Sequence, residues 1–223
     1  MSDKPSIAVL GGTGNIGPGL VMRWAYAGYD VMVGSREKEK ARETARMVNE
    51  KLGIGTVQGM ENSDAAKAAD ICVLTVAAKA HKAALESLKE AVQGKILVDA
   101  TARVSFPDAI APQPPSAGRI AQEILGEGAT VVMAFQNVPS AALKKDIGEK
   151  IDSHVLVCAD DAAAAEMVIQ LIEAAGMEGY YAGGLDNGFV VEGLTALLIH
   201  MNRHYGGHGT IQVAGINKNK DQD

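Results

Sequence analysis

The chain has 223 residues, 47% of them hydrophobic and 4% aromatic, which is enough apolar material for a full, mainly aliphatic core. Its formal net charge of −6 argues against a nucleic-acid partner, because phosphate binding needs a basic face. No apolar run approaches the ~18 residues of a membrane span. The N-terminal apolar run is too short for a signal peptide, and Cys72 and Cys158 lie in apolar runs, as buried, reduced thiols do. We therefore expect a cytoplasmic protein without disulfides or membrane spans.

Strands and helical patterns alternate over the first hundred residues, which is typical of a parallel sheet with crossover helices. Strands are predicted at Ser6–Leu10, Asp30–Val33, Thr56–Met60, Asp70–Val76, Lys95–Ala100, Thr130–Phe135, Ser153–Cys158 and Gly179–Ala182. Helices are predicted at Ile16–Ala27, Glu37–Leu52, Asn62–Ala69, Ala80–Val92, Ala117–Leu125, Ala162–Ala175 and Phe189–His204. The helix from Asn62 is expected to have a polar cap, and the one from Ala162 to be capped by Asp160 or Asp161. The segment Ser105–Ser116 holds four of the seven prolines and is predicted to be a loop.

These elements predict an α/β fold. Residues 1–183 are expected to form a Rossmann dinucleotide-binding domain with a mostly parallel sheet, and residues 184–223 a small C-terminal helical segment. The last helix is apolar nearly all round, although a terminal helix needs only one buried stripe. Its other face is therefore expected to contact a second subunit, with packing inside one chain as the alternative. The tail after this helix ends in a polar segment that is expected to be disordered.

The strongest motif is IAVLGGTGNIG, in which Gly12, Gly14 and Gly17 form G-x-G-x-x-G between a predicted strand and a predicted helix. Such glycines provide a tight turn, room for a pyrophosphate and close packing of the helix, whose free N–H groups face the phosphates. A plain glycine turn is the alternative. The strand–helix context favours a dinucleotide site.

The segment GSREKEK after the second strand indicates which dinucleotide binds. Sites for NAD place an acidic residue there to hold the ribose 2′-hydroxyl. Here Ser35 offers a hydroxyl, Arg36 a guanidinium, and Lys40 an ammonium one helical turn further on, while Thr13 adds a hydroxyl from the glycine loop. Such donors attract a 2′-phosphate, so NADP is predicted over NAD. The alternative is a solvated helix start, because glutamates alternate with the lysines.

Other titratable residues carry weaker signals. His200, His204 and His208 are spaced as metal ligands could be, but no carboxylate follows in register, so a helix end is preferred and no metal is predicted. His81 either contacts a phosphate or ring or starts an exposed helix. Arg103 is expected to be a surface arginine rather than a ligand for an anionic substrate.

The chain resembles the NADPH-dependent reductases of the deazaflavin coenzyme F420 over nearly its whole length. The matching segments are IAVLGGTGNIGPGL, VMVGSREKEKA, DAAKAADICVLTV, VVMAFQNVPSAAL, VCADD and GGLDNGFVVEGLTALLIHMNR. The glycine loop is common to many enzymes, whereas the GSR segment together with the C-terminal segment is much more specific. Two places depart from the archaeal pattern: VAAKAHKA replaces a Pro-Trp with a nearby His, and Gln136 stands where a His can occur.

The resemblance implies reversible hydride transfer between C4 of the nicotinamide of NADP(H) and C5 of the deazaflavin, with both rings in one cleft, and a homodimer. The residues it assigns are Thr13, Gly14, Asn15 and Ile16 for the pyrophosphate, Ser35, Arg36 and Lys40 for the 2′-phosphate, Val76 and Ala77 for the nicotinamide, Ala102 and Ser140 near the ring, and Gln136 to Val138 facing the deazaflavin. Transfer between two preformed rings depends mainly on positioning, so no catalytic residue is required. Gln136 and Asn137 are the candidates to meet developing charge.

Two alternatives remain for the function. One is an NADPH-dependent reductase of the same architecture that acts on a flavin, an imine or a metal chelate. The other is a non-catalytic NADP-sensing module, because GGTGNIG also contains the spacing G-x-x-G-x-x-G.

Overall fold

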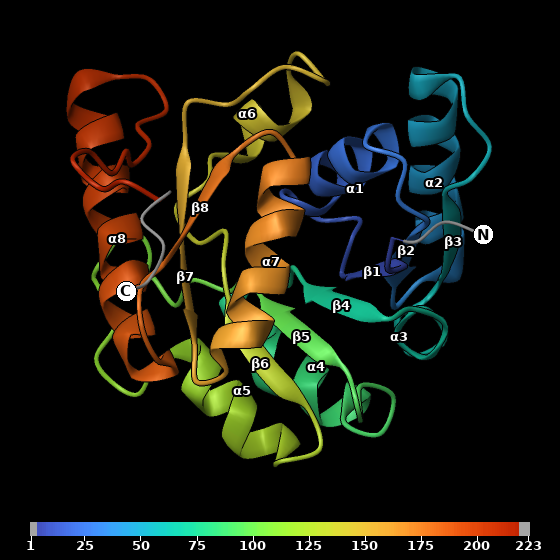
Figure 1. The fold of residues 1–223 in the computed structure, drawn as a ribbon, viewed down its shortest axis with the longest axis horizontal. Helices are drawn as coiled ribbons and strands as arrows, with labels where there is room; N and C mark the ends of the chain where they lie inside the picture. The colour runs from blue at the N-terminus through green and yellow to red at the C-terminus, as the bar shows by residue number, and fades with distance from the viewer. Residues whose placement is uncertain (1–3, 219–223) are drawn as a thin grey trace.

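An eight-stranded sheet forms the centre of the computed structural model, which describes residues 4–218 (Figure 1). The strands are β1 (Ile7–Leu10), β2 (Val31–Ser35), β3 (Gln58–Glu61), β4 (Ile71–Leu74), β5 (Ile96–Asp99), β6 (Thr130–Met133), β7 (His154–Ala159) and β8 (Glu178–Tyr181). Their order is β3-β2-β1-β4-β5-β6-β7-β8. Strands β1 to β6 are parallel, β7 is antiparallel to β6, and β8 is parallel to β7. The predicted strands are all present, and the first six have the Rossmann order, so the predicted fold class is confirmed.

The predicted helices are also present. They are α1 (Gly17–Tyr26), α2 (Lys38–Leu52), α3 (Asn62–Ala68), α4 (His81–Leu88), α5 (Ala117–Leu125), α7 (Ala162–Ala174) and α8 (Gly188–Tyr205). The helix expected to reach Val92 ends at Leu88, and a 3-10 turn, Ala78–Ala80, precedes it. An additional helix, α6 (Ser140–Lys144), is too short for a helical period to reveal it in the sequence.

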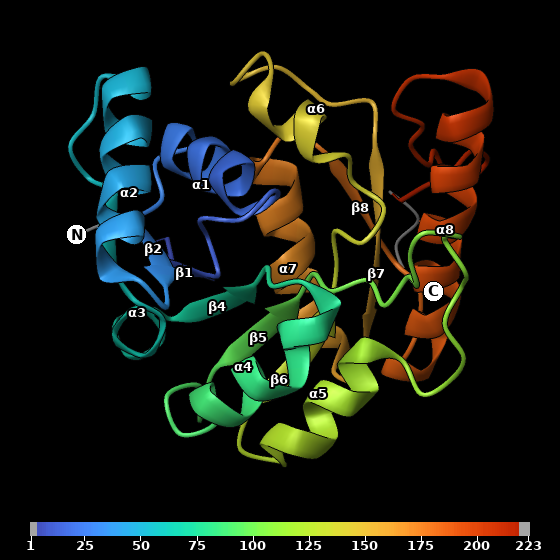
Figure 2. The same cartoon turned by 180° about the vertical axis from the view of Figure 1, so that it is seen from behind.

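Helices cover both faces of the sheet. As a result, β1, β2 and β4 are buried along their whole length. On one face pack α1, α2 and α7, and on the other α3, α4 and α5. Figure 1 shows α7 in front of the sheet, and Figure 2 shows α4 and α5 from behind. The carboxyl ends of the parallel strands are thus left for the loops.

Two residues of α1 hold this helix against the later part of the chain. The indole N–H of Trp24 donates to the carbonyl of Leu171 at 2.8 Å, and its ring packs edge-on against Phe135. The buried guanidinium of Arg23 donates to carbonyls at the ends of α6 and α7, including Lys145 O at 2.7 Å. Burial lowers the pKa of Arg23 below its ordinary value. The last turn of α1 is therefore fixed relative to α6 and α7.

The two expected helix caps have different outcomes. Asp161 caps α7, since its carboxylate accepts hydrogen bonds from Ala163 N and Ala164 N at 2.8 and 3.1 Å. The expected polar side-chain cap of α3 is wrong. Asn62 lies inside that helix, and its side-chain oxygen accepts from Gly11 N at 3.0 Å. This amide therefore supports the glycine loop.

The segments around α8 complete the fold. The proline-rich segment 105–116 forms a loop, as predicted. One isolated β-bridge within it joins Ser105 and Ile110. The tail is held by hydrogen bonds at residues 209–213, before its polar end. There Gly209 N donates to Asn202 Oδ1 at 2.6 Å, and Val213 N donates to His154 Nδ1 at 2.8 Å. The polar end, which is the part expected to be disordered, lies mainly outside the described residues. The division of the chain at residue 183 stays a prediction.

Both cysteines are free and buried, as predicted. Burial raises the pKa of Cys72 and of Cys158 to about 11, so both remain protonated at neutral pH. No helix within residues 4–218 is long and apolar enough to cross a bilayer.

Candidate functional site

The glycine loop joins β1 to α1 at the carboxyl edge of the sheet. Gly11 has a φ of 72°, which favours glycine, and Gly12 N donates to Gly34 O at 2.9 Å. A Cβ on Gly12 would lie 2.6 Å from Val9 O, and one on Gly17 would lie 2.5 Å from Gly12 O. Gly12 and Gly17 therefore allow close backbone packing. The role of Gly11, whose positive φ allows the turn after β1, was not predicted from the sequence.

The exposed part of the loop is open to a ligand. Gly14 and Asn15 are exposed, and Thr13 and Ile16 are half-buried beside them. No side chain caps the start of α1, whose first N–H groups lie next to this stretch. A helix N-terminus with free N–H groups favours an anion such as a pyrophosphate. The four residues assigned to the pyrophosphate thus lie together.

The candidate 2′-phosphate residues follow β2. Ser35 ends the strand and is buried, and its hydroxyl accepts from Glu37 N at 3.2 Å. Arg36 is exposed and forms no ion pair among the described residues. Lys40, in contrast, pairs with Glu37 Oε1 at 2.6 Å. Arg36 is therefore the cation that is most available to a phosphate.

A hollow of about 760 Å³ lies between the glycine loop and the first turns of α2. Thr13 lines it from the loop and Lys40 from α2, which brings together two residues that are far apart in the sequence. Two glutamates also line it. Glu39 is paired with Arg42 and Glu43 with Arg46. Their charges are therefore partly compensated within α2.

The residues assigned to the nicotinamide follow β4 and β5. Thr75 is hydrogen-bonded to Leu10 O through both its N and its Oγ1, which joins the ends of β4 and β1. Val76 comes next and lies against the glycine loop, because a Cβ on Gly11 would meet its side chain at 2.8 Å. Ala77 is exposed at the same edge. Ala102, after β5, packs instead with the apolar residues between the proline loop and α8.

The end of β6 carries two buried amides. Phe135, directly before them, has a φ of 77°, which non-glycine residues rarely adopt; strained backbone of this kind clusters at functional sites. Gln136 Nε2 donates to Asp99 O at 2.7 Å, and Asn137 Nδ2 donates to Thr195 Oγ1 at 2.8 Å. The side-chain oxygens of both amides are buried and have no partner in the described part of the chain. Such oxygens can accept from a ligand.

These amides line a pocket of about 250 Å³ between the β6–α6 connection and α8. The connection contributes residues 136–139 and α6 contributes Ser140 and Ala141, so Gln136, Asn137 and Ser140 are brought together as expected. Helix α8 contributes Thr195 and Asn202, and the tail contributes His208 and Gly209. That α8 and the tail line this pocket was not predicted from the sequence, because only the tertiary fold brings them close to the end of β6.

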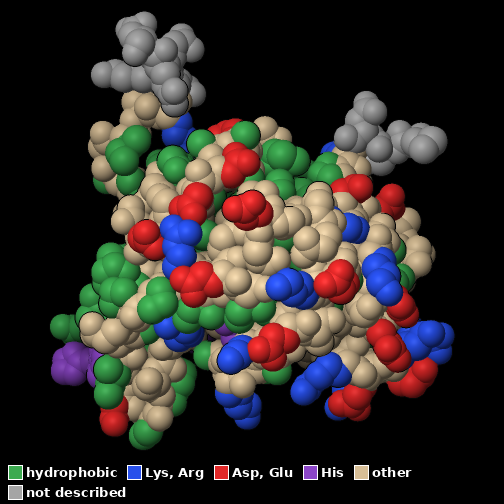
Figure 3. All heavy atoms as spheres, turned by 90° about the horizontal axis from the view of Figure 1, so that it is seen from below, with side chains coloured by type: hydrophobic (Ala, Val, Ile, Leu, Met, Phe, Trp, Pro, Cys, Tyr) green, Lys and Arg blue, Asp and Glu red, His purple; other side chains and the backbone are tan. Residues whose placement is uncertain are grey.

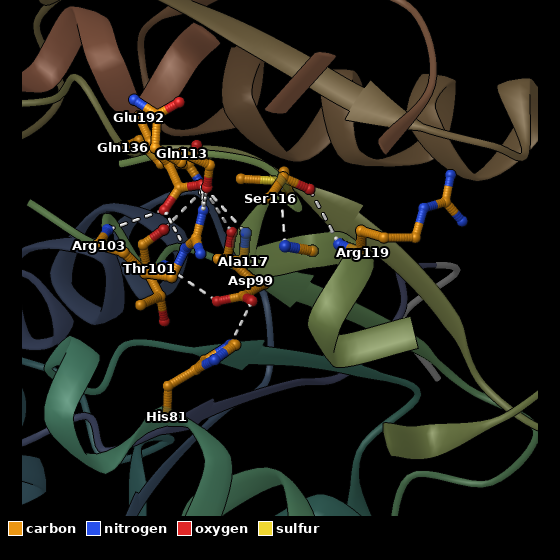
Figure 4. A network of polar contacts seen from close by, with 12 residues as sticks. His81, Asp99, Thr101, Arg103, Gln113, Ser116, Ala117, Arg119, Gln136 and Glu192 are labelled. Atoms are coloured by element: carbon orange, nitrogen blue, oxygen red, sulfur yellow. Dashed lines mark hydrogen bonds and ion pairs between the residues drawn. The ribbon is translucent and has the colours of Figure 1, made fainter. Parts of the chain in front are cut away.

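His81 and Arg103 are both in places that the sequence did not predict. His81 begins α4 but is 4% exposed, and its Nε2 lies 2.6 Å from Asp99 Oδ2 (Figure 4). The expectation of an exposed helix start is therefore wrong. Arg103 is not a free surface residue either, because it forms an ion pair with the fully buried Glu192 at 2.9 Å. Glu192 also accepts from Ala117 N, so this pair joins α8 to the proline loop and α5.

No group of three or more His, Cys, Asp or Glu side chains within the described residues is arranged to hold a metal ion. The exposed His200 and His204 lie on the last turns of α8, and His208 lines the pocket between the β6–α6 connection and α8.

Comparison with known proteins decides the family. A family model described as NADP oxidoreductase, coenzyme F420-dependent, matches residues 6–103. The F420-dependent NADP reductase of Methanothermobacter thermautotrophicus is 38% identical over 208 residues, which cover 88% of each chain. The enzyme of the same name from Methanocaldococcus jannaschii is 38% identical over 215 residues, 92% of this chain and 95% of that one. The chain belongs to the F420-dependent NADP reductase family.

The fold agrees with this family. A crystal structure from Arthrobacter sp. FB24, provisionally described as an F420-dependent NADP reductase, matches with a TM-score of 0.80 and 25% identity, covering 95% of this chain and 100% of that one. The resemblance inferred from the sequence is therefore confirmed, and it extends through the C-terminal segment.

Proposed function

We propose that this chain is an oxidoreductase that transfers a hydride reversibly between NADP(H) and coenzyme F420. The observation that carries this function is the family relationship at 38% identity over 88% of the chain. NADPH, oxidised F420 and a proton give NADP⁺ and reduced F420, with the hydride passing from nicotinamide C4 to deazaflavin C5. The protein has to bring the two carbon atoms into contact and exclude water from them.

The structure supports an assignment of roles along the carboxyl edge. The pyrophosphate lies against Gly12–Gly17 and the N-terminus of α1, and the 2′-phosphate against Ser35, Arg36 and Lys40. The nicotinamide follows the edge past Val76 and Ala77. The deazaflavin then occupies the pocket lined by the β6–α6 connection and α8. This arrangement agrees with the rule that ligands of open α/β sheets bind outside the carboxyl ends of the strands.

Within this arrangement, Gln136 and Asn137 remain the candidates to interact with the reduced deazaflavin. Their amide nitrogens are engaged by Asp99 O, Val191 O and Thr195, so their unpartnered oxygens are the atoms left for a ligand. A ring N–H is the matching donor. Ala102 packs beside α8 rather than at the strand edge. We therefore assign it to the wall of the site that holds the two rings.

The activity test compares acceptors. Purified protein with NADPH should reduce F420, seen as loss of the deazaflavin absorbance, and should reduce FMN much more slowly. The Gln136→Ala and Asn137→Ala variants should keep NADPH binding and lose F420 turnover. Faster reduction of FMN or of an imine would favour a related reductase, and NADPH binding without reduction of any acceptor would favour a sensing module. Unchanged F420 turnover in both variants would remove the two amides from the mechanism.

The same proposal includes a cytoplasmic homodimer formed through α8. The apolar side chains Val190, Leu197 and Met201 follow one another at helical spacing and are 52%, 59% and 52% exposed. In Figure 3 hydrophobic side chains gather on the left, the side of α8, whereas charged side chains dominate the right. An exposed apolar stripe on a terminal helix is typical of a subunit contact.

Replacing Leu197 with aspartate should convert the dimer into a monomer, because it places a charge within the stripe. The side chain is already exposed in one chain, so the monomer should stay folded. Light scattering after gel filtration measures the mass. Met47→Asp, at a methionine that is 51% exposed on α2, is the matched control and should remain dimeric. A wild-type chain that is monomeric at every concentration would contradict the proposed dimer.

A further inference from the structure

The His81–Asp99 pair is buried at the carboxyl edge, and the function proposed above does not use it. His81 is 4% exposed and Asp99 is fully buried, and their side chains meet at 2.6 Å. Removing a carboxylate from water costs several kcal/mol unless a partner and further hydrogen bonds compensate it. A pair of this kind between the start of α4 and the end of β5 therefore calls for an explanation beyond packing.

Asp99 is also the centre of a wider network. Its Oδ1 accepts from Thr101 N at 2.9 Å, and its backbone carbonyl accepts from Gln136 Nε2 at 2.7 Å. Because a carbonyl can only accept, the amide of Gln136 is held with its nitrogen toward Asp99 and its oxygen away from it. Figure 4 shows Asp99 between His81 on one side and Thr101 on the other. One aspartate thus orients residues from two successive strand ends.

The two residues held by Asp99 both have an unused oxygen. Thr101 Oγ1 and Gln136 Oε1 are buried and have no hydrogen-bond partner among residues 4–218. Thr101 is 1% exposed and Gln136 is 7% exposed. A buried polar oxygen without a partner costs stability, and its most economical explanation is a ligand that supplies the missing donor.

We propose that His81 and Asp99 are positioning residues of the hydride-transfer site, which hold Thr101 and Gln136 so that their free oxygens accept hydrogen bonds from an amide or imide N–H of a bound ring. The inference rests on the proposed function, because that function brings two such groups to this edge. These are the carboxamide of the nicotinamide and the imide edge of the deazaflavin. Neither His81 nor Asp99 transfers a proton in this account.

The sharpest test uses Thr101→Val, which removes an oxygen that has no hydrogen bond in the chain and keeps the shape of the side chain. A purely structural role predicts an unchanged or higher melting temperature and unchanged kcat. Our inference predicts the same melting temperature but a kcat for F420 reduction lower by about 10- to 100-fold, as misplacement of a ring by about 1 Å can cause. A rise in KM for NADPH identifies the carboxamide as the donor, and a rise in KM for F420 identifies the deazaflavin.

The His81 variants test the positioning pair. His81→Gln retains an N–H that can reach Asp99 and should keep most of the kcat, whereas His81→Ala should lose about as much as Thr101→Val. Val168→Ala, in the core on the opposite sheet face, is the control for a general loss of stability and should keep its kcat below its melting temperature. If wild-type protein reduces F420 and Thr101→Val does so within twofold of it, the inference is wrong and the proposed function stands. If wild-type protein does not reduce F420, both are wrong.

Discussion

Replacing Arg36 with aspartate should weaken NADPH binding by about 100-fold, and NADH binding by only a few-fold. A charge-assisted hydrogen bond is worth about 1.5–3 kcal/mol, which corresponds to about 10- to 150-fold in affinity, and the new carboxylate would in addition repel the 2′-phosphate. Arg36 is exposed and unpaired within the described residues, whereas the neighbouring Lys40 is bound to Glu37. The loss should therefore be concentrated at Arg36. Titration of NADPH and of NADH by calorimetry measures both affinities.

Arg42→Asp is the matched control for this substitution. Arg42 is exposed on α2 and pairs with Glu39, so its replacement makes the same change in net charge without removing the proposed phosphate contact. NADPH affinity should fall by much less than in Arg36→Asp. If Arg36→Asp weakens NADPH and NADH equally, the assignment of the 2′-phosphate to this corner is wrong.

The second large effect is expected in the glycine loop. Alanine at Gly17 should impair both folding and NADPH binding, whereas alanine at Gly14 should impair NADPH binding alone. A Cβ at position 17 would lie 2.5 Å from Gly12 O and 2.6 Å from Gly12 Cα, so the backbone of α1 would have to move. We expect Gly17→Ala to lower the free energy of unfolding by about 1–3 kcal/mol, as overpacking does, and to lose NADPH binding. Thermal unfolding and calorimetry measure the two effects.

Gly14→Ala separates an effect on NADPH binding from an effect on stability. A Cβ at Gly14 would lie 3.4 Å from Gly11 O, which is ordinary van der Waals contact, so the melting temperature should not change. The methyl group would, however, stand on the exposed side of the loop, where the pyrophosphate is proposed to approach. A steric cost of about 1–3 kcal/mol would weaken NADPH by about five- to 150-fold. Unchanged NADPH affinity in Gly14→Ala would place the pyrophosphate elsewhere.

Local sequence patterns were sufficient for the sheet and for the positions of the glycine loop and the GSR segment. Apolar runs such as IAVL and ICVL are short, and glycine, proline or charged residues bound them, so their strands are visible without tertiary information. The glycine loop and GSR segment follow strands directly, which places them at the carboxyl edge. The family resemblance depended on the same segments together with the C-terminal one.

The second half of the site could not be read in this way, because it depends on contacts between distant segments. From the sequence, a ligand contact and an exposed helix start are equally open for His81, because its buried partner Asp99, at 2.6 Å, lies 18 residues further along the chain. The course of residues 209–213 has no sequence signal, because it depends on hydrogen bonds to Asn202 and to the distant His154. The left-handed backbone of Phe135, whose ring packs edge-on against Trp24, has no sequence signal either.

The central claim is that hydride passes directly between two rings held at the carboxyl edge of one sheet. It is tested most directly by a single turnover of NADPH deuterated at both C4 positions with oxidised F420 in ordinary water. Nuclear magnetic resonance of the product should show one deuterium at C5 of the reduced deazaflavin. Reduced F420 that carries only protium at C5, or no reduced F420 at all, would contradict the claim.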